Sequence, residues 1–127
     1  MAGTKLIFVV DDDPFITTLV EKRFTPEGYR VAAFDYGEEC IKALSQKPDL
    51  IILDYLFHKG GSKVMNGMEV LGVIRERMPG LPVIMLSGQD KGEVVFELAR
   101  KGIDDYVIKD NNLIENLGKA IKEVLSR

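Results

Sequence analysis

The sequence has one cysteine, no tryptophan and no strong excess of either charge. Because Cys40 is the sole cysteine, the chain cannot form a disulfide within itself, and a reducing compartment such as the cytoplasm is expected. The 17 basic residues are outnumbered by 20 acidic ones, for a net charge of −3. Domains that bind nucleic acid usually carry a basic excess, so direct nucleic-acid binding is not expected.

Long apolar runs are also missing. No run reaches the length of about 18 residues that a membrane helix needs, and the first run, Leu6 to Val10, is too short for the core of a signal peptide. The composition is that of an ordinary globular protein, with 46% hydrophobic and 29% charged residues. The length of 127 residues suits one domain, so we expect residues 1–127 to form a single domain away from the membrane.

Five short apolar runs alternate with stretches of helical spacing. Four runs are nearly continuous in Val, Ile and Leu, which is typical of strands buried on both faces of a parallel sheet. The second run alternates in polarity and suits an edge strand. The runs are Leu6–Val10, Tyr29–Phe34, Leu50–Leu53, Val83–Leu86 and Tyr106–Ile108. This alternation predicts an α/β fold of five strand–helix units with right-handed crossovers.

Several helix starts are marked by their side chains. Asp13 precedes Pro14, which favours a capped helix beginning at the proline. Elsewhere Asp or Asn is followed three residues later by Glu, which resembles a capping box. These pairs are Asp35/Glu38, Asn66/Glu69, Asp90/Glu93 and Asn112/Glu115. The last predicted helix, 113–125, has the clearest apolar stripe.

Polar residues directly follow four of the five predicted strands. They are Asp11-Asp12-Asp13, Asp54, Ser87-Gly88 and Lys109-Asp110. Taken singly, most have an ordinary explanation, such as a helix cap for Asp13, a turn for Ser87 or a surface position for Lys109. Asp54 is harder to explain as a helix cap, because a long loop follows it and not a helix. Because ligands of open α/β sheets bind beyond the carboxyl ends of the strands, the residues together predict one complementary site at that edge.

The predicted site has the composition for phosphoryl chemistry. Neighbouring carboxylates repel one another, and a hard divalent cation such as Mg²⁺ relieves that repulsion. An ion beside Asp54 would neutralise an incoming phosphoryl group, while Lys109 could pair with its oxygens and Ser87 could donate a hydrogen bond to one of them. Asp54 is therefore a candidate nucleophile that would form an acyl phosphate.

These residues resemble the receiver domain of two-component response regulators, and the resemblance covers the whole chain. The matching segments are Ile7–Pro14, Pro48–Asp54, Met65–Leu71, Pro82–Gly88 and Gly102–Lys109. The resemblance implies a doubly wound, flavodoxin-like (βα)5 fold with a five-stranded parallel sheet in the order 2-1-3-4-5. It also implies a signalling domain with intrinsic phosphotransfer and autodephosphorylation chemistry rather than a metabolic enzyme.

The resemblance implies a role for each residue of the site. Asp54 matches the phosphoacceptor, and Asp11 and Asp12 match the acid pair that, with Asp54 and the backbone carbonyl of Leu56, holds Mg²⁺. Lys109 matches the phosphate-binding lysine. The implied donor is a sensor histidine kinase or a histidine phosphotransfer protein, and the implied output is a downstream protein or a fused effector domain.

The resemblance also implies a conformational switch. Ser87 matches the hydroxyl switch residue and Tyr106 the aromatic one. Phosphorylation would draw Ser87 inward, leave room for Tyr106 to rotate, and shift the face formed by the helix expected after Asp90, the strand of Tyr106 and the helix 113–125. The alternative is that Tyr106 is a half-buried strand aromatic that does not switch.

The sequence departs from the family pattern beside Asp54. Phe57-His58 stands where the family usually has Met-Pro, and Gly67 comes thirteen residues after Asp54 because of a five-residue insertion. The segment 57–64 is either an ordinary surface loop, with His58 solvated, or a loop that covers the acyl phosphate or selects the partner. Deleting residues 59–63 without changing phosphotransfer or hydrolysis would exclude the second alternative.

Two further departures concern the bond after Lys109 and the access of water. Asp110 replaces the proline that commonly follows the lysine, and a non-proline cis bond costs about 2.5–4 kcal/mol, so a trans bond is favoured over a strained cis one.

Leu56 and Gln89 occupy the two positions that border the path of the hydrolytic water. We predict slower self-dephosphorylation than in Leu56→Asn, whereas equal decay rates would refute this idea.

Other functions remain open at this stage. The main alternative is a phosphorylation-independent interaction module of the same fold, against which the complete set of site residues argues. A magnesium-dependent aspartyl phosphatase is disfavoured because that class needs a second Asp where Leu56 stands. The kinase, the output and the oligomeric state, monomer or weak dimer, are not readable, nor is whether the chain is a whole regulator or part of a longer one.

Overall fold

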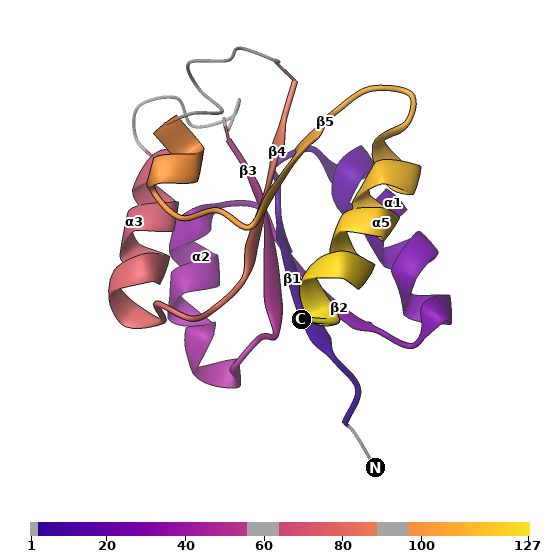
Figure 1. The fold of residues 1–127 in the computed structure, drawn as a ribbon, viewed down its shortest axis with the longest axis horizontal. Helices are drawn as coiled ribbons and strands as arrows, with labels where there is room; N and C mark the ends of the chain where they lie inside the picture. Colours follow the sequence, from indigo (N-terminus) through magenta and orange to yellow (C-terminus); the bar gives the residue numbers. More distant parts are fainter. Residues whose placement is uncertain (1–2, 56–63, 89–96) are drawn as a thin grey trace.

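A computed structural model of the chain describes residues 3–55, 64–88 and 97–127. The helices and strands lie in three layers, with a central sheet between two layers of helices (Figure 1). The strands are β1 (Leu6–Val10), β2 (Arg30–Phe34), β3 (Leu50–Asp54), β4 (Val83–Ser87) and β5 (Asp105–Ile108). The helices are α1 (Pro14–Phe24), α2 (Gly37–Lys42), α3 (Gly67–Arg77) and α5 (Leu113–Leu125), with 3-10 turns at Thr25–Glu27 and Leu44–Gln46. Residues 97–100 are also helical.

The sheet confirms the predicted fold. Its five strands are parallel and stand in the order β2-β1-β3-β4-β5. Every residue of β1, β3 and β4 is buried, as their continuous Val, Ile and Leu content predicts for strands covered on both faces. Strand β2 lies at one edge and is partly exposed, as its alternating pattern predicts.

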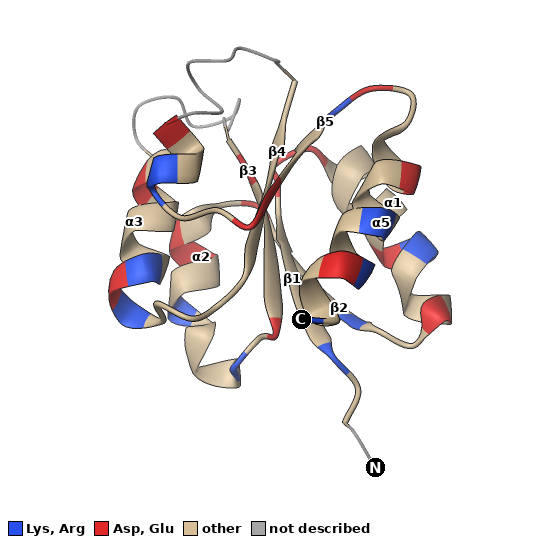
Figure 2. Ribbon diagram, viewed as in Figure 1, with Lys and Arg blue, Asp and Glu red and all other residues tan. Residues whose placement is uncertain are grey.

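Each face of the sheet has its own hydrophobic core. On one face, α1 and α5 cover alternate residues of the inner strands, and α5 contributes Leu117, Ile121 and Val124. On the other face, α2 and α3 pack over Phe8 and its neighbours, and the Phe8 and Phe34 rings meet edge to face at 4.8 Å. Burial of each large apolar side chain contributes about 1.5–3 kcal/mol. Charged residues lie on the helices and near the strand ends (Figure 2).

Two of the predicted helix starts are confirmed. The Asp13 carboxylate accepts a hydrogen bond from the Phe15 N–H, and Pro14 occupies the first turn of α1. Asn66 caps α3 in a complete capping box, because its side chain accepts from the Glu69 N–H while the Glu69 carboxylate accepts from the Asn66 N–H. Side-chain caps therefore set the residues at which α1 begins after β1 and α3 begins after β3.

Two other predicted capping boxes are wrong. Helix α2 begins after Tyr36 without a side-chain cap, and the Glu38 carboxylate instead accepts a hydrogen bond from the Met65 N–H. Asn112 makes no side-chain cap bond to α5, and its N–H donates to the Asp110 carboxylate. In both places another residue makes the hydrogen bond that the capping box needs: the Met65 N–H takes the Glu38 carboxylate, and the Asp110 carboxylate takes the Asn112 N–H. The predicted pair Asp90/Glu93 lies outside the described residues.

The connection after β5 has ordinary backbone geometry. The peptide bond between Lys109 and Asp110 is trans, as favoured from the sequence, because the described residues contain no cis bond. None of the helices in the described ranges has the length and hydropathy to cross a membrane.

Candidate functional site

The register of the sheet brings the predicted site residues to one edge. Val10 is paired with Leu53, so the residues that follow them, Asp11 and Asp54, are neighbours. Ser87 at the end of β4 is paired with Ile108, and the next residue, Lys109, donates its backbone N–H to the Ser87 carbonyl at 2.8 Å. The carboxyl ends of β1, β3, β4 and β5 thus deliver their polar residues to the same place.

One lysine joins two buried aspartates at this edge. The Lys109 Nζ lies 2.7 Å from Asp11 Oδ2 and 3.0 Å from Asp54 Oδ1. The side chains of Asp11 and Asp54 are 0% and 3% exposed, and that of Lys109 is 17% exposed. Asp12 and Ser87 are buried as well. Charges removed from water in this way interact more strongly than surface ion pairs do.

Among the residues that the structure describes, the negative charge of the site exceeds its positive charge. Asp11, Asp12 and Asp54 each place a carboxylate oxygen within 4.8 Å of the others. Burial raises the pKa of Asp11, opposed by the hydrogen bonds from Lys109 and the Asp13 N–H. Burial alone would lower the pKa of Lys109, but its contacts with Asp11 and Asp54 outweigh this and raise the pKa. Three clustered carboxylates beside one ammonium fit a divalent cation with oxygen ligands, such as Mg²⁺. The Leu56 carbonyl, the predicted backbone ligand, lies outside the described residues, as do His58 and Gln89.

Backbone hydrogen bonds hold the aspartates in place. The Asp11 N–H donates to the Phe34 carbonyl at 3.0 Å, and Asp11 Oδ1 accepts from the Asp13 N–H at 2.9 Å. The residue after Asp54, Tyr55, donates its N–H to the Leu86 carbonyl at 2.8 Å. The carboxylates are thus held on the ends of rigid strands, which limits the reorganisation needed when charge develops nearby.

Gly67 packs directly against the end of β3. Its N–H donates to the Tyr55 carbonyl at 2.9 Å, and a Cβ at this position would overlap the backbone of Asp54 and Tyr55. Only glycine permits this approach without moving the strand end that carries Asp54. The sequence pattern included Gly67 in a segment that matches the family. It assigned Glu38 to a capping box with Asp35 and gave no indication of the bond that Glu38 accepts from Met65, two residues before Gly67.

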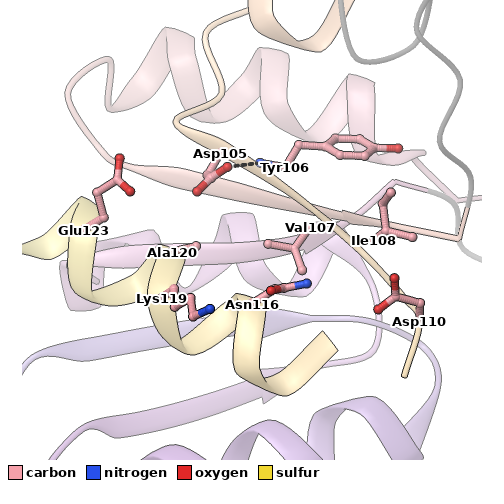
Figure 3. A pocket seen from close by; sticks show the side chains of 9 residues that line it. All are labelled: Asp105, Tyr106, Val107, Ile108, Asp110, Asn116, Lys119, Ala120 and Glu123. Atoms are coloured by element: carbon pink, nitrogen blue, oxygen red, sulfur yellow. Dashed lines mark hydrogen bonds between the residues drawn. The ribbon is translucent and has the colours of Figure 1, made fainter. Parts of the chain in front are cut away.

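Tyr106 lies on the same face of the sheet as Ser87. Its partner across the sheet is Met85, and residues two apart in a strand share a face. Figure 3 shows the Tyr106 ring directed away from α5, whereas Val107 points toward that helix. The Tyr106 ring packs with the core under α2 and α3. Between β5 and α5 lies a cavity of about 270 Å³, lined by both hydrophobic and charged residues.

Comparisons with known proteins agree with this geometry. Residues 7–122 match the family model described as the response regulator receiver domain. The chain belongs to the response regulator receiver family. Its sequence is 33% identical over 122 residues to a probable transcriptional regulatory protein TcrX of Mycobacterium tuberculosis, covering 95% of this chain and 50% of that protein. It is 34% identical over 124 residues to the alkaline phosphatase synthesis regulator PhoP of Bacillus subtilis, covering 97% and 49%.

Solved receiver structures have the same fold. The chemotaxis protein CheY4 of Vibrio cholerae superposes with a TM-score of 0.85 at 26% identity, covering 97% of this chain and 100% of that one. The NtrX receiver domain of Brucella abortus superposes with a TM-score of 0.84 at 26% identity, covering 94% of this chain and 98% of that one.

This receiver chain spans about half or less of the length of the curated relatives that it matches. It is a signalling domain and not an enzyme of the metabolic kind.

Proposed function

We propose that Asp54 accepts a phosphoryl group from a phosphohistidine on a sensor histidine kinase or a phosphotransfer protein. The supporting observation is the buried carboxylate of Asp54, which lies among two further acids and 3.0 Å from the Lys109 ammonium. An Asp54 oxygen would form the P–O bond while the P–N bond to the donor imidazole breaks, and the leaving nitrogen takes up a proton. The product is an acyl phosphate on the protein.

The other residues of the site position and neutralise the transferred group. Lys109 would exchange its contact with Asp54 for one with a phosphoryl oxygen, and the Ser87 hydroxyl would donate to another. Asp11 and Asp12, with Asp54, are the residues that would hold Mg²⁺, which supplies positive charge against the phosphoryl oxygens. Such transfer depends on positioning and electrostatic stabilisation more than on acid–base chemistry.

The same residues provide a path from phosphorylation to output. Ser87 and Tyr106 share a face of the sheet, and Tyr106 is half-buried and next to the start of β5. If the phosphoryl group draws Ser87 inward, the states in which Tyr106 turns inward gain population. The face formed by β5 and α5 would change with them and present a different surface to a downstream protein or a fused effector domain.

A surface beside Lys109 supports a protein donor. Phe15 leaves 68% of its surface exposed at the start of α1. With Ile16, Leu19 and Ile114 it lines a groove of about 420 Å³ that reaches Lys109. The apolar side chains that line this groove could contact apolar side chains of a protein donor. We further propose that residues 1–127 act as one phosphoacceptor domain in the cytoplasm, as a monomer or a weak dimer.

The proposal is tested by incubating the protein with acetyl phosphate and Mg²⁺ and measuring its intact mass. We expect a gain of one phosphoryl group by the wild type and none by Asp54→Asn, in which the nucleophilic carboxylate is replaced by an amide of the same shape. Chelation of the metal should abolish the gain as well. A folded wild-type protein that gains no mass from this donor or from a phosphohistidine protein would favour the phosphorylation-independent interaction module.

A further inference from the structure

Glu38 is a charged residue outside the site whose side chain is committed to a distant backbone group. Its Oε2 accepts a hydrogen bond of 3.0 Å from the N–H of Met65, 27 residues along the chain. Its Oε1 is buried and receives no hydrogen bond from the described part of the chain. Burying a carboxylate oxygen without a hydrogen bond costs free energy, and such a group in a native protein calls for an explanation.

The position of Glu38 is fixed by the packing of α2 on α3. The neighbouring Gly37 lies so close to Val70 of α3 that a Cβ on Gly37 would overlap the Val70 side chain. Gly37 and Val70 are both fully or almost fully buried. The first turn of α2 therefore has little freedom to move, and the Glu38 carboxylate holds Met65 from a rigid support.

From Met65 the contact continues to the phosphoacceptor. Met65 is followed by Asn66, which caps α3, and by Gly67, whose N–H donates to the Tyr55 carbonyl. Gly67 also packs against the carbonyl of Asp54 without room for a Cβ. A change in the position of Met65 is thus passed over two residues to the backbone that carries Asp54.

We propose that Glu38 is a positioning residue for phosphoryl transfer to Asp54, an inference that rests on the proposed function. It acts by fixing Met65 and therefore the contact of Gly67 with the end of β3. The acids on the β1 side, Asp11 and Asp12, are held separately through the bonds of Asp11 to Phe34 and Asp13. Loss of the Glu38 contact should therefore slow transfer more than it weakens Mg²⁺ binding, because small misplacements of a reacting group cost large factors in rate, whereas two of the three carboxylates of the cluster are held independently of Glu38.

The experiment compares Glu38→Ala and Glu38→Gln with the control Glu39→Ala, which removes an exposed carboxylate from the same turn of α2. The rate of phosphorylation by acetyl phosphate at saturating Mg²⁺ is followed by intact mass, and Mg²⁺ affinity is measured by calorimetry. We expect Glu38→Ala to be about 3–10-fold slower, with Mg²⁺ affinity changed less than about twofold. Glu38→Gln should recover most of the rate, since its amide oxygen can accept from the Met65 N–H.

A further variant covers the case in which Glu38→Ala does not fold. Glu38→Asp keeps the charge but is one methylene too short to reach Met65, so it should be slow like the alanine variant. Wild-type rates in Glu38→Ala or Glu38→Asp, or an equal loss in Glu39→Ala, would overturn the inference, as would a glutamine variant no faster than alanine. A wild-type protein that is not phosphorylated at all would instead refute the proposed function, and the inference with it.

Discussion

Two clusters of charged side chains lie at opposite ends of the sheet, and their charges are balanced differently. At the carboxyl end, three buried aspartates cluster, and two of them, Asp11 and Asp54, contact the ammonium of Lys109. At the amino end, one aspartate, Asp104, lies between two arginines. Both clusters join segments far apart in the sequence. Among the described residues, the first has more negative than positive groups, whereas in the second the positive groups outnumber the single carboxylate.

The cluster at the amino end is fully paired. Asp104 Oδ2 accepts from the Val83 N–H at 2.8 Å and lies 3.2 Å from Arg75 Nη2, while its Oδ1 lies 3.1 Å from Arg127 Nη1. Arg75 also donates to the Gly102 carbonyl. These side chains are 20–54% exposed, so water screens their charges. This cluster connects the starts of β4 and β5 to α3 and to Arg127, two residues after the end of α5.

The difference between the clusters separates structural from functional charge. Where each charge has a partner, removing a residue should reduce stability and leave chemistry alone. Where like charges are buried close together, their repulsion reduces the free energy of unfolding. Such a cluster is favourable only when a further cation or a phosphoryl group binds to it, which indicates a functional site. The following predictions test this contrast, from the largest expected effect to the smallest.

Replacing Lys109 with Met should have the largest effect. The change leaves Asp11 and Asp54 buried without their cation, so we expect phosphorylation by acetyl phosphate to slow by about 100-fold or more. Unfolding in the absence of Mg²⁺ should become easier by about 1–3 kcal/mol, since the ion pairs are lost but the lysine is partly exposed. Urea denaturation and intact mass measure the two effects, with Lys101→Met, an exposed lysine, as the control. Unchanged phosphorylation would contradict the role of Lys109.

Replacing Asp104 with Ala should affect stability alone. It removes the acceptor of the Val83 N–H and the carboxylate partner of Arg75 and Arg127, while Arg75 keeps its bond to the Gly102 carbonyl, and we expect a loss of about 1–3 kcal/mol in the free energy of unfolding. At a temperature where the variant is folded, its phosphorylation rate should equal that of the wild type. The structural account of this cluster would be wrong if the rate fell as much as in Lys109→Met.

Replacing Asp12 with Asn should act in the opposite direction on stability. Removing one of three crowded carboxylates relieves repulsion, so the variant should be about 1 kcal/mol more stable than the wild type without metal. Mg²⁺ at ten times its dissociation constant should stabilise the wild type by about 1.4 kcal/mol and the variant much less. Thermal unfolding with and without Mg²⁺ measures both. A variant less stable than the metal-free wild type would contradict the proposed charge excess.

The effect that is smallest near neutral pH is expected in the core under α2, away from both clusters. Burial raises the pKa of the Cys40 thiol from 9.0 to about 12. Since the folded pKa exceeds the unfolded one, this contribution to stability is complete below pH 9 and is lost progressively as the pH rises toward 12. The melting temperature of the wild type should therefore fall more steeply between pH 9 and 11 than that of Cys40→Ala, in which Lys109 still titrates. Parallel curves would show that the thiol is not buried in solution.

The sequence pattern was sufficient for the sheet and for most of the site. Apolar runs without interruption identify β1, β3 and β4 because a strand covered on both faces has no polar position. Asp54, Ser87 and Lys109 stand at or directly after strand ends, and the parallel topology alone brings them together. Asn66 and Glu69 form their capping box as predicted, since both partners lie within one turn of α3.

Contacts that depend on tertiary packing could not be predicted in this way. Asp35 and Glu38 have the spacing of a capping box, but the packing of α2 on α3 presents the Met65 N–H to Glu38, and that contact replaces the local one. The pairing of Arg75 with Asp104 joins residues 29 positions apart and has no local signature. Both contacts arise only after the helices dock on the sheet.

The most direct test of the central claim locates the modified residue. The protein is phosphorylated with acetyl phosphate and Mg²⁺, reduced with borohydride to convert an acyl phosphate to a stable alcohol, and analysed by peptide mass spectrometry. The account predicts that the aspartate at position 54, and no other acid of the cluster, is reduced to homoserine. Reduction at Asp11 or Asp12, or none in a protein that has gained a phosphoryl group, would contradict it.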